Sequence, residues 1–158
     1  MNVIFTCGGT GGHINPALGT AGYIKEKHPS AEIVFVGTAD KMEARLVPEA
    51  GYELRTIEIS GFWRSFSLNA IKHNIGTLLK LLKSSSQAKK IIKDFKPDLV
   101  IGFGGYVSGP VLRMAAKMGI PTAVHEQNAF PGVTNKALAG KVDRVMLTAI
   151  QAEKYIKS

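Results

Sequence analysis

The sequence predicts an α/β fold in which helices cover both faces of a Rossmann-like parallel sheet. Short apolar runs alternate with helical patterns along the whole chain. Several of these runs are almost continuously apolar, as in strands that are buried on both faces. Glycine clusters follow two of the runs, at points where such strands turn into helices. This alternation indicates right-handed crossovers between parallel strands, and we expect one domain over residues 1–158.

The predicted strands are short runs of mostly apolar residues. They cover residues 3–7, 33–36, 54–59, 99–101, 122–124 and 144–147. Pro97 and Pro121 stand just before two of them, and the residue before a proline resists the helical conformation. The prolines therefore support strand starts near residues 99 and 122.

The predicted helices have apolar residues at helical spacing. They cover residues 17–27, 42–50, 68–83, 87–95, 111–118 and 133–139, with a further helix start over 150–156. The three serines at 84–86 are expected to interrupt the long basic helical stretch.

Composition bounds the class of protein. The chain has 158 residues, of which 45% are hydrophobic and 20% charged, so it is long enough to bury a core. Cys7 is the one cysteine, which excludes a disulfide framework and fits a reducing compartment. The first residues lack a signal peptide, and no apolar run approaches the roughly 20 residues of a spanning helix. We therefore expect a cytoplasmic protein, with a membrane surface as the alternative.

Positive charge is concentrated in one segment. The net charge is +8, and residues 61–96 contain eight basic residues against one acid, Asp94. This segment therefore carries +7 of the excess. Such a patch suits an anionic surface, which includes nucleic acid, but no RNA- or DNA-binding motif accompanies it and we expect no nucleic-acid partner.

Two glycine loops are candidate anion sites. The first contains Gly8, Gly9, Thr10, Gly11 and Gly12, and the second contains Gly104, Gly105, Tyr106 and Ser108. Ligands of open parallel sheets bind at the carboxyl ends of strands, where glycines admit an anion to the backbone and to a helix N-terminus. Two such loops on one edge could hold two parts of a diphosphate-bearing ligand. The alternative is that the glycines only make tight turns.

Two common nucleotide signatures are missing from these loops. The G-x-G-x-x-G pattern fails because Ile14 occupies its last position, and no acid ends the second predicted strand. There is also no G-x-x-x-x-G-K-[ST] sequence. An NAD site is thus disfavoured and a Walker site is absent.

Polar side chains stand beside the glycine loops. His13 is a candidate general base because its reference pKa lies near neutrality, although it could instead cap the helix or bind phosphate. His125, Glu126, Gln127 and Asn128 follow the fifth predicted strand, and we expect them to hydrogen-bond a sugar or a polar head group. His125 and Glu126 are too few for a metal site, so none is predicted.

Taken in order, four motifs resemble those of the MurG-type glycosyltransferases. They are Gly8-Gly9-Thr10-Gly11-Gly12-His13 with Pro16-Ala17-Leu18, Gly61-Phe62-Trp63-Arg64, Gly104-Gly105-Tyr106-Val107-Ser108-Gly109-Pro110, and His125-Glu126-Gln127-Asn128. The resemblance covers essentially the whole chain. It implies the N-terminal, acceptor-binding half of a GT-B fold, whose C-terminal donor-binding domain has no counterpart here.

The resemblance also implies an activity. MurG-type enzymes move N-acetylglucosamine from UDP-N-acetylglucosamine to the 4-hydroxyl of the muramic acid of lipid I, with inversion and no required cofactor. The product, lipid II, serves peptidoglycan synthesis and hence cell shape and division. By residue match His13 would be the base, with Thr10, Tyr106, His125, Glu126 and Asn128 lining the cleft. A half without the donor domain is expected to be inactive alone.

A lipid-anchored acceptor implies peripheral binding to the cytoplasmic face of the bacterial cell membrane. The expected contacts are aromatic and basic residues after the third predicted strand, namely Phe62, Trp63, Arg64, Phe66, Lys72, Lys80 and Lys83. An apolar stripe on residues 68–82 is more typical of core.

Two alternatives stay open. One is a non-catalytic membrane anchor for a separate donor-binding subunit. The other is a GT-B enzyme that acts on a sterol or small glycoside, a function that explains Trp63 and the lysine cluster less well.

Overall fold

The computed structural model describes residues 1–59 and 68–156, with side chains for residues 1–59 and 82–156. Within these residues one parallel sheet has the strand order β3-β2-β1-β4-β5-β6. The strands are β1 (Asn2–Thr6), β2 (Glu32–Gly37), β3 (Glu53–Thr56), β4 (Leu99–Gly102), β5 (Thr122–Glu126) and β6 (Arg144–Leu147). All six predicted strands are confirmed, although β3 ends at Thr56, three residues earlier than expected.

The helices differ more from the prediction. They are α1 (Gly11–Lys27), α2 (Glu43–Glu49), α3 (Leu68–Phe95), α4 (Ser108–Lys117), α5 (Val133–Ala139) and the 3₁₀ helix η1 (Ile150–Tyr155). Helix α1 begins at Gly11, six residues before the predicted start, and it contains Pro16. The predicted break at the three serines is wrong, because α3 runs through them. A serine costs at most about 0.7 kcal/mol relative to alanine in a helix, and the neighbouring Ala88 and Ile92 are buried in the core.

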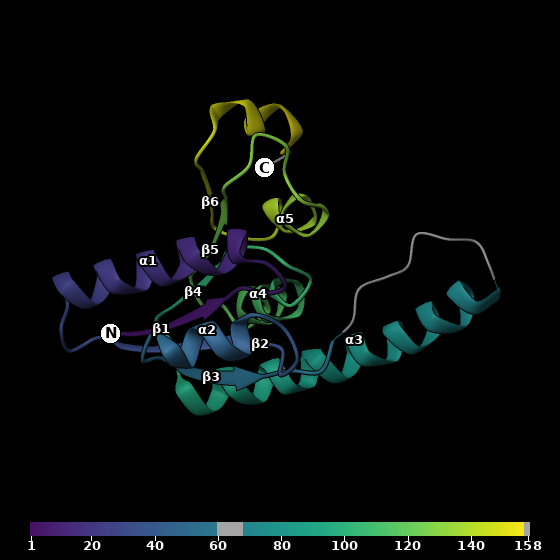
Figure 1. The fold of residues 1–158 in the computed structure, drawn as a ribbon, viewed down its shortest axis with the longest axis horizontal. Coiled ribbons are helices and arrows are strands. Elements are labelled where there is room, and N and C mark those ends of the chain that lie inside the picture. The colour runs from purple at the N-terminus through teal and green to yellow at the C-terminus, as the bar shows by residue number, and fades with distance from the viewer. Residues whose placement is uncertain (60–67, 157–158) are drawn as a thin grey trace.

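The sheet is covered on both faces (Figure 1). Ile4 points to the face that packs on α3, α4 and α5 through residues such as Ile92 and Leu112. The next residue, Phe5, points to the opposite face, where α1 and α2 pack. This alternation follows from the two-residue period of a strand, and it confirms the predicted layers. Figure 1 also shows the first turns of α3 extending beyond the sheet.

The strand order places the candidate site. It reverses between β1 and β4, which lie side by side at the centre of the sheet. In open α/β sheets, ligands bind in the crevice beyond the carboxyl ends of strands at such a switch point. The first glycine loop follows β1 and the second follows β4, so the two loops flank it.

Candidate functional site

The two glycine loops touch each other. A Cβ atom at Gly105 would lie 2.5 Å from the carbonyl oxygen of Gly8, and Gly105 has a φ of +78°. Gly104 has a φ of +105°, and a Cβ there would lie 2.8 Å from Cδ2 of His13. Side chains are therefore excluded at both positions by conformation and by contact. The glycines make tight turns, as the alternative interpretation required, and they also bring the loops together around His13.

His13 is held from both sides. It is the third residue of α1 and is half-buried. Its Nδ1 lies 2.9 Å from the Gly8 carbonyl oxygen and 3.3 Å from the Thr10 hydroxyl, while the Nε2 edge of the ring faces Gly104. A carbonyl oxygen only accepts hydrogen bonds, so in the neutral ring Nδ1 carries the proton. Nε2 then keeps a free electron pair, which is what a general base requires.

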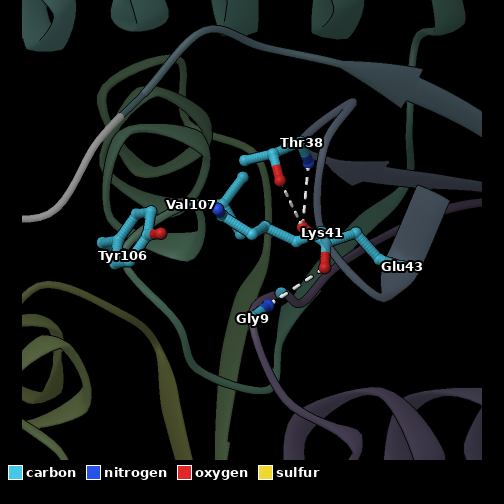
Figure 2. A pocket seen from close by; sticks show the side chains of 7 residues that line it. Gly9, Thr38, Lys41, Glu43, Tyr106 and Val107 are labelled. Carbon is cyan, nitrogen blue, oxygen red and sulfur yellow. Dashed lines mark hydrogen bonds between the residues drawn. The ribbon is translucent and has the colours of Figure 1, made fainter.

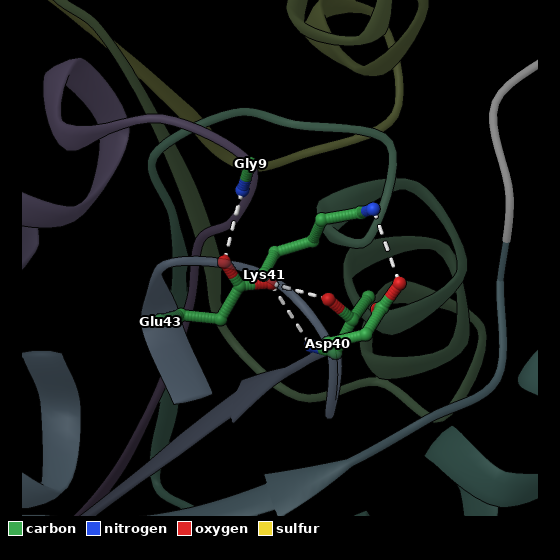
Figure 3. Close-up of polar contacts among 5 residues, drawn as sticks. Gly9, Asp40, Lys41 and Glu43 are labelled. Carbon is green, nitrogen blue, oxygen red and sulfur yellow. Dashed lines mark hydrogen bonds and ion pairs between the residues drawn. The ribbon is translucent and has the colours of Figure 1, made fainter. Parts of the chain in front are cut away.

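Glu43, which the sequence analysis did not single out, holds the first glycine loop. Its side chain is fully buried. One carboxylate oxygen accepts the Gly9 N–H at 3.0 Å (Figure 3), and the other accepts the N–H and the hydroxyl of Thr38 at 3.0 Å and 2.7 Å (Figure 2). The Gly9 N–H, expected to face an anion, is therefore already used within the protein. An acid in a first helical turn is common for electrostatic reasons, so the sequence alone gave little signal.

A small hollow lies beside this carboxylate (Figure 2). It is lined by Gly8, Gly9, Thr38, Lys41, Glu43, Tyr106 and Val107, so both glycine loops contribute. Lys41 is exposed and pairs with Asp40 at 3.1 Å. The hydrogen bond between them lowers the pKa of Asp40 and raises that of Lys41. Lys41 is a second residue that the sequence analysis missed, since it reaches the site from the loop after β2.

Glu126 has a structural role in the loop after β5. The residue is buried, and its carboxylate accepts hydrogen bonds from the backbone of Asn128 and Gly132 and from the side chains of Asn128 and Asn135. Burial acts to raise the pKa of Glu126, but these hydrogen bonds together hold it below the ordinary value. The carboxylate thus organises residues 127–132, and the expected direct contact to a ligand is replaced by this role.

His125 and Gln127 present unsatisfied polar atoms. His125 Nε2 lies 2.9 Å from the Thr148 hydroxyl, and the centroids of the His125 and Phe103 rings are 5.3 Å apart. Burial lowers the pKa of His125, with Glu126 acting weakly in the opposite direction. Among the described residues, no group hydrogen-bonds the buried atoms His125 Nδ1 and Gln127 Oε1. Both atoms are buried, so neither is exposed to a ligand in this conformation.

The other predicted ligand contacts include both buried and exposed residues. Ser108 is fully buried and donates its hydroxyl to the carbonyls of Thr6 and Gly104, so it fixes the second loop to β1 rather than facing a ligand. Thr10, Gly12, Tyr106 and Asn128 are exposed and accessible.

The predicted membrane residues are mostly outside the described part of the chain. Phe62, Trp63, Arg64 and Phe66 lie there entirely, as do the side chains of Lys72 and Lys80. Lys83 is described; its side chain is exposed, and its ammonium lies 2.8 Å from both carboxylate oxygens of Glu58. In the part of the chain that the structure describes, no helix is long and apolar enough to cross a membrane.

Comparison with known proteins decides the family. Residues 3–147 match the glycosyltransferase family 28 N-terminal domain. The chain belongs to this family. The matched residues include both glycine loops and the whole parallel sheet except Asn2, the first residue of β1.

Relatives of this family 28 domain are longer proteins. The chain is 54% identical over 157 residues to the UDP-N-acetylglucosamine–N-acetylmuramyl-(pentapeptide) pyrophosphoryl-undecaprenol N-acetylglucosamine transferase of Alkaliphilus oremlandii, covering 99% of this chain and 42% of the relative. The Acetivibrio thermocellus protein of the same name is also 54% identical, with the same coverage. The chain thus spans about two fifths of the length of the curated relatives it matches.

Solved structures agree with the fold class. The crystal structure of MurG from Acinetobacter baumannii superposes with a TM-score of 0.80 at 32% identity, covering 95% of this chain and 42% of that one. A putative UDP-N-acetylglucosamine 2-epimerase from Listeria monocytogenes superposes with a TM-score of 0.67 at 15% identity, covering 98% and 41%, and this match shows the fold alone. The predicted family resemblance and the predicted N-terminal half of a GT-B fold are confirmed.

Proposed function

We propose that this family 28 domain binds the acceptor in a longer enzyme that transfers N-acetylglucosamine from UDP-N-acetylglucosamine to lipid I. The names of the relatives supply the reaction, and a separate donor-binding domain completes the active site. The observation that carries the proposal is His13, fixed at the switch point of the sheet with Nδ1 on the Gly8 carbonyl and with no described residue hydrogen-bonded to Nε2.

In this mechanism His13 acts as the general base. The acceptor 4-hydroxyl oxygen attacks the anomeric carbon of the donor sugar while the bond from that carbon to the UDP oxygen breaks. UDP leaves with the electron pair, and the hydroxyl proton passes to Nε2 of His13. Attack opposite the leaving group inverts the anomeric centre. The Gly8 carbonyl, 2.9 Å from Nδ1, stabilises the imidazolium that forms.

The acceptor diphosphate is assigned to the first glycine loop. The Thr10 carbonyl accepts the N–H groups of His13 and Ile14 at 3.1 Å and 3.2 Å. The N–H groups of Gly11 and Gly12, which lie in the positive field of the helix, are therefore the ones assigned to the anion. Exposed Lys41 adds a cation at the adjoining hollow, which Tyr106 also lines. The sugar and its peptide are assigned to the loop after β5, where Asn128 is exposed.

The lipid carrier places the domain on the cytoplasmic face of the membrane. The proposed contacts are the aromatic residues near Trp63 and the lysines of the segment that carries +7. Each cation near an anionic surface contributes roughly 1 kcal/mol. Leu82, which is 66% exposed on α3, adds an apolar residue to this proposed surface. This role needs no nucleic acid.

The test removes the base in a complete enzyme. We would join this chain to the donor-binding part of the Alkaliphilus oremlandii relative and compare His13→Ala with His28→Ala, an exposed histidine that directly follows the last residue of α1. Loss of a general base is expected to lower kcat by about 10² to 10⁴-fold, with little change in the KM for lipid I. The control should match the unsubstituted enzyme. Equal losses in kcat and in acceptor affinity would remove His13 from the role of base.

A further inference from the structure

The buried carboxylate of Glu43 has no obvious purpose in packing. It accepts three hydrogen bonds, all from neutral donors. Taking a charge out of water costs several kcal/mol, so an apolar side chain would fill this space more favourably. Two glycines make room for it, since a Cβ at Gly8 or at Gly37 would lie 2.6 Å from the Glu43 side chain. Glycines at the ends of two separate strands therefore leave space for this carboxylate.

One peptide unit links Glu43 to His13. The N–H of Gly9 and the C=O of Gly8 belong to the same planar peptide group. Glu43 accepts that N–H at 3.0 Å, and His13 Nδ1 bonds that C=O at 2.9 Å. In a trans peptide the two groups point in opposite directions, so holding one fixes the direction of the other. The carboxylate and the imidazole thus hydrogen-bond to opposite ends of the same peptide dipole.

This peptide would rotate easily without a restraint. Both of its flanking residues are glycine, and Gly9 has a φ of +88° with nothing within 4 Å of an added Cβ, whereas the Gly8 side is packed against Glu43 and Val107. A rotated peptide would turn its N–H toward His13, where Nδ1 could only accept it. The proton of the neutral ring would then sit on Nε2, which could no longer take a proton from a hydroxyl.

We propose that Glu43 is a positioning residue that locks the Gly8–Gly9 peptide with its carbonyl toward His13, and so fixes the tautomer in which Nε2 is free. The inference rests on the proposed function for its consequence in catalysis, but the geometry can be tested without it. The carboxylate also polarises the peptide, which strengthens the hydrogen bond that the Gly8 carbonyl accepts.

Two variants separate this role from general support of the fold. In the orientation that keeps both Thr38 donors paired with the amide oxygen, Glu43→Gln turns its NH₂ toward the Gly9 N–H and leaves that donor unpaired. Thr38→Val is the matched control, because it removes the 2.7 Å hydroxyl bond to Glu43 and leaves the Gly9 contact in place. Both variants change the same buried cluster.

The readout is the tautomer of His13, measured on the 158-residue chain by long-range ¹H–¹⁵N NMR of the imidazole rings, with His13→Asn to assign the signals. We expect Nδ1–H in the unsubstituted chain and in Thr38→Val, and a shift toward Nε2–H in Glu43→Gln. An unchanged tautomer in a folded Glu43→Gln chain, or an equal shift in Thr38→Val, would overturn the proposal. If Glu43→Gln does not fold, the tautomer of His13 in the unsubstituted chain still tests the proposal. A proton on Nε2 there would contradict a Gly8 carbonyl that is held toward Nδ1.

Activity of the joined enzyme distinguishes this inference from the proposed function. A histidine in the wrong tautomer can lose up to about 10⁴-fold in kcat, so Glu43→Gln should lose at least about tenfold with the KM for lipid I little changed. Loss of kcat together with the tautomer shift supports both. A shifted tautomer with unchanged kcat would leave the Glu43 link standing and overturn the role of His13 as base.

Discussion

Replacing Gly105 with alanine tests the contact between the two glycine loops. The new Cβ would lie 2.5 Å from the Gly8 carbonyl oxygen and 3.1 Å from the Gly8 carbonyl carbon. Both atoms belong to the backbone of the first loop, so relief requires that one loop move. Because the Gly8 carbonyl also bonds His13, this movement would disturb the proposed base.

The cost of Gly105→Ala has two parts. A left-handed conformation costs alanine about 1–2 kcal/mol, and forcing a methyl group into a packed site typically costs a further 1–3 kcal/mol. Gly119→Ala is the matched control, because Gly119 has a similar φ of +73° but nothing within 4 Å of its added Cβ. The difference between the two variants therefore isolates the contact, and we expect Gly105→Ala to be the less stable by about 1–3 kcal/mol.

Urea unfolding of the 158-residue chain measures this difference, and thermal unfolding checks it. Each kcal/mol corresponds to roughly 2–4 °C in Tm for a domain of this size. Equal stability of Gly105→Ala and Gly119→Ala would show that the loops are not in tight contact. The geometry assigned to His13 would then lose its main support.

Two further predictions concern charge. Lys41→Met should weaken the binding of inorganic pyrophosphate by a few-fold at low salt and less at high salt, because Lys41 is exposed; an NMR titration that matches the unsubstituted chain would place the anion elsewhere. Glu126→Gln should destabilise the domain by about 1–3 kcal/mol at pH 7, since an amide would face the donors that the carboxylate now accepts. The folded pKa of Glu126 lies below its ordinary value of 4.5, so its contribution is complete above that pH and is lost as the pH falls through the folded pKa. Urea midpoints from pH 7 to pH 3 should thus fall less steeply for Glu126→Gln, and parallel curves would contradict this account.

The sheet could be predicted because burial on two faces leaves a clear pattern. Runs such as residues 33–36 contain apolar side chains only, and all six predicted strands formed. The ends of the helices were harder to predict from the sequence. Gly11 and Gly12 were predicted as loop residues, yet they form the first turn of α1, because the buried Ile14 and Ala17 outweigh the roughly 1 kcal/mol that a glycine costs in a helix. Pro16, near which the helix was expected to open, lies inside α1.

The site could be predicted only in part, for a physical reason. Glycines after a strand and His13 at a helix start indicate a location, because the carboxyl ends of parallel strands are where ligands bind. A polar side chain gives no sign of whether it bonds a ligand or the protein itself. Glu126 and Ser108 turned out to bond the backbone. Glu43 and Lys41 reach the site through the separate crossover after β2, which no local pattern reveals.

Binding of this chain to vesicles with and without lipid I tests the central claim most directly. The vesicles would contain the same mixture of anionic and zwitterionic lipids, and UDP-N-acetylglucosamine would be titrated separately. We expect lipid I to raise the affinity at least about tenfold, which is about 1.4 kcal/mol, while the donor binds weakly. Tight binding of UDP-N-acetylglucosamine with no response to lipid I would contradict the assignment of this domain to the acceptor.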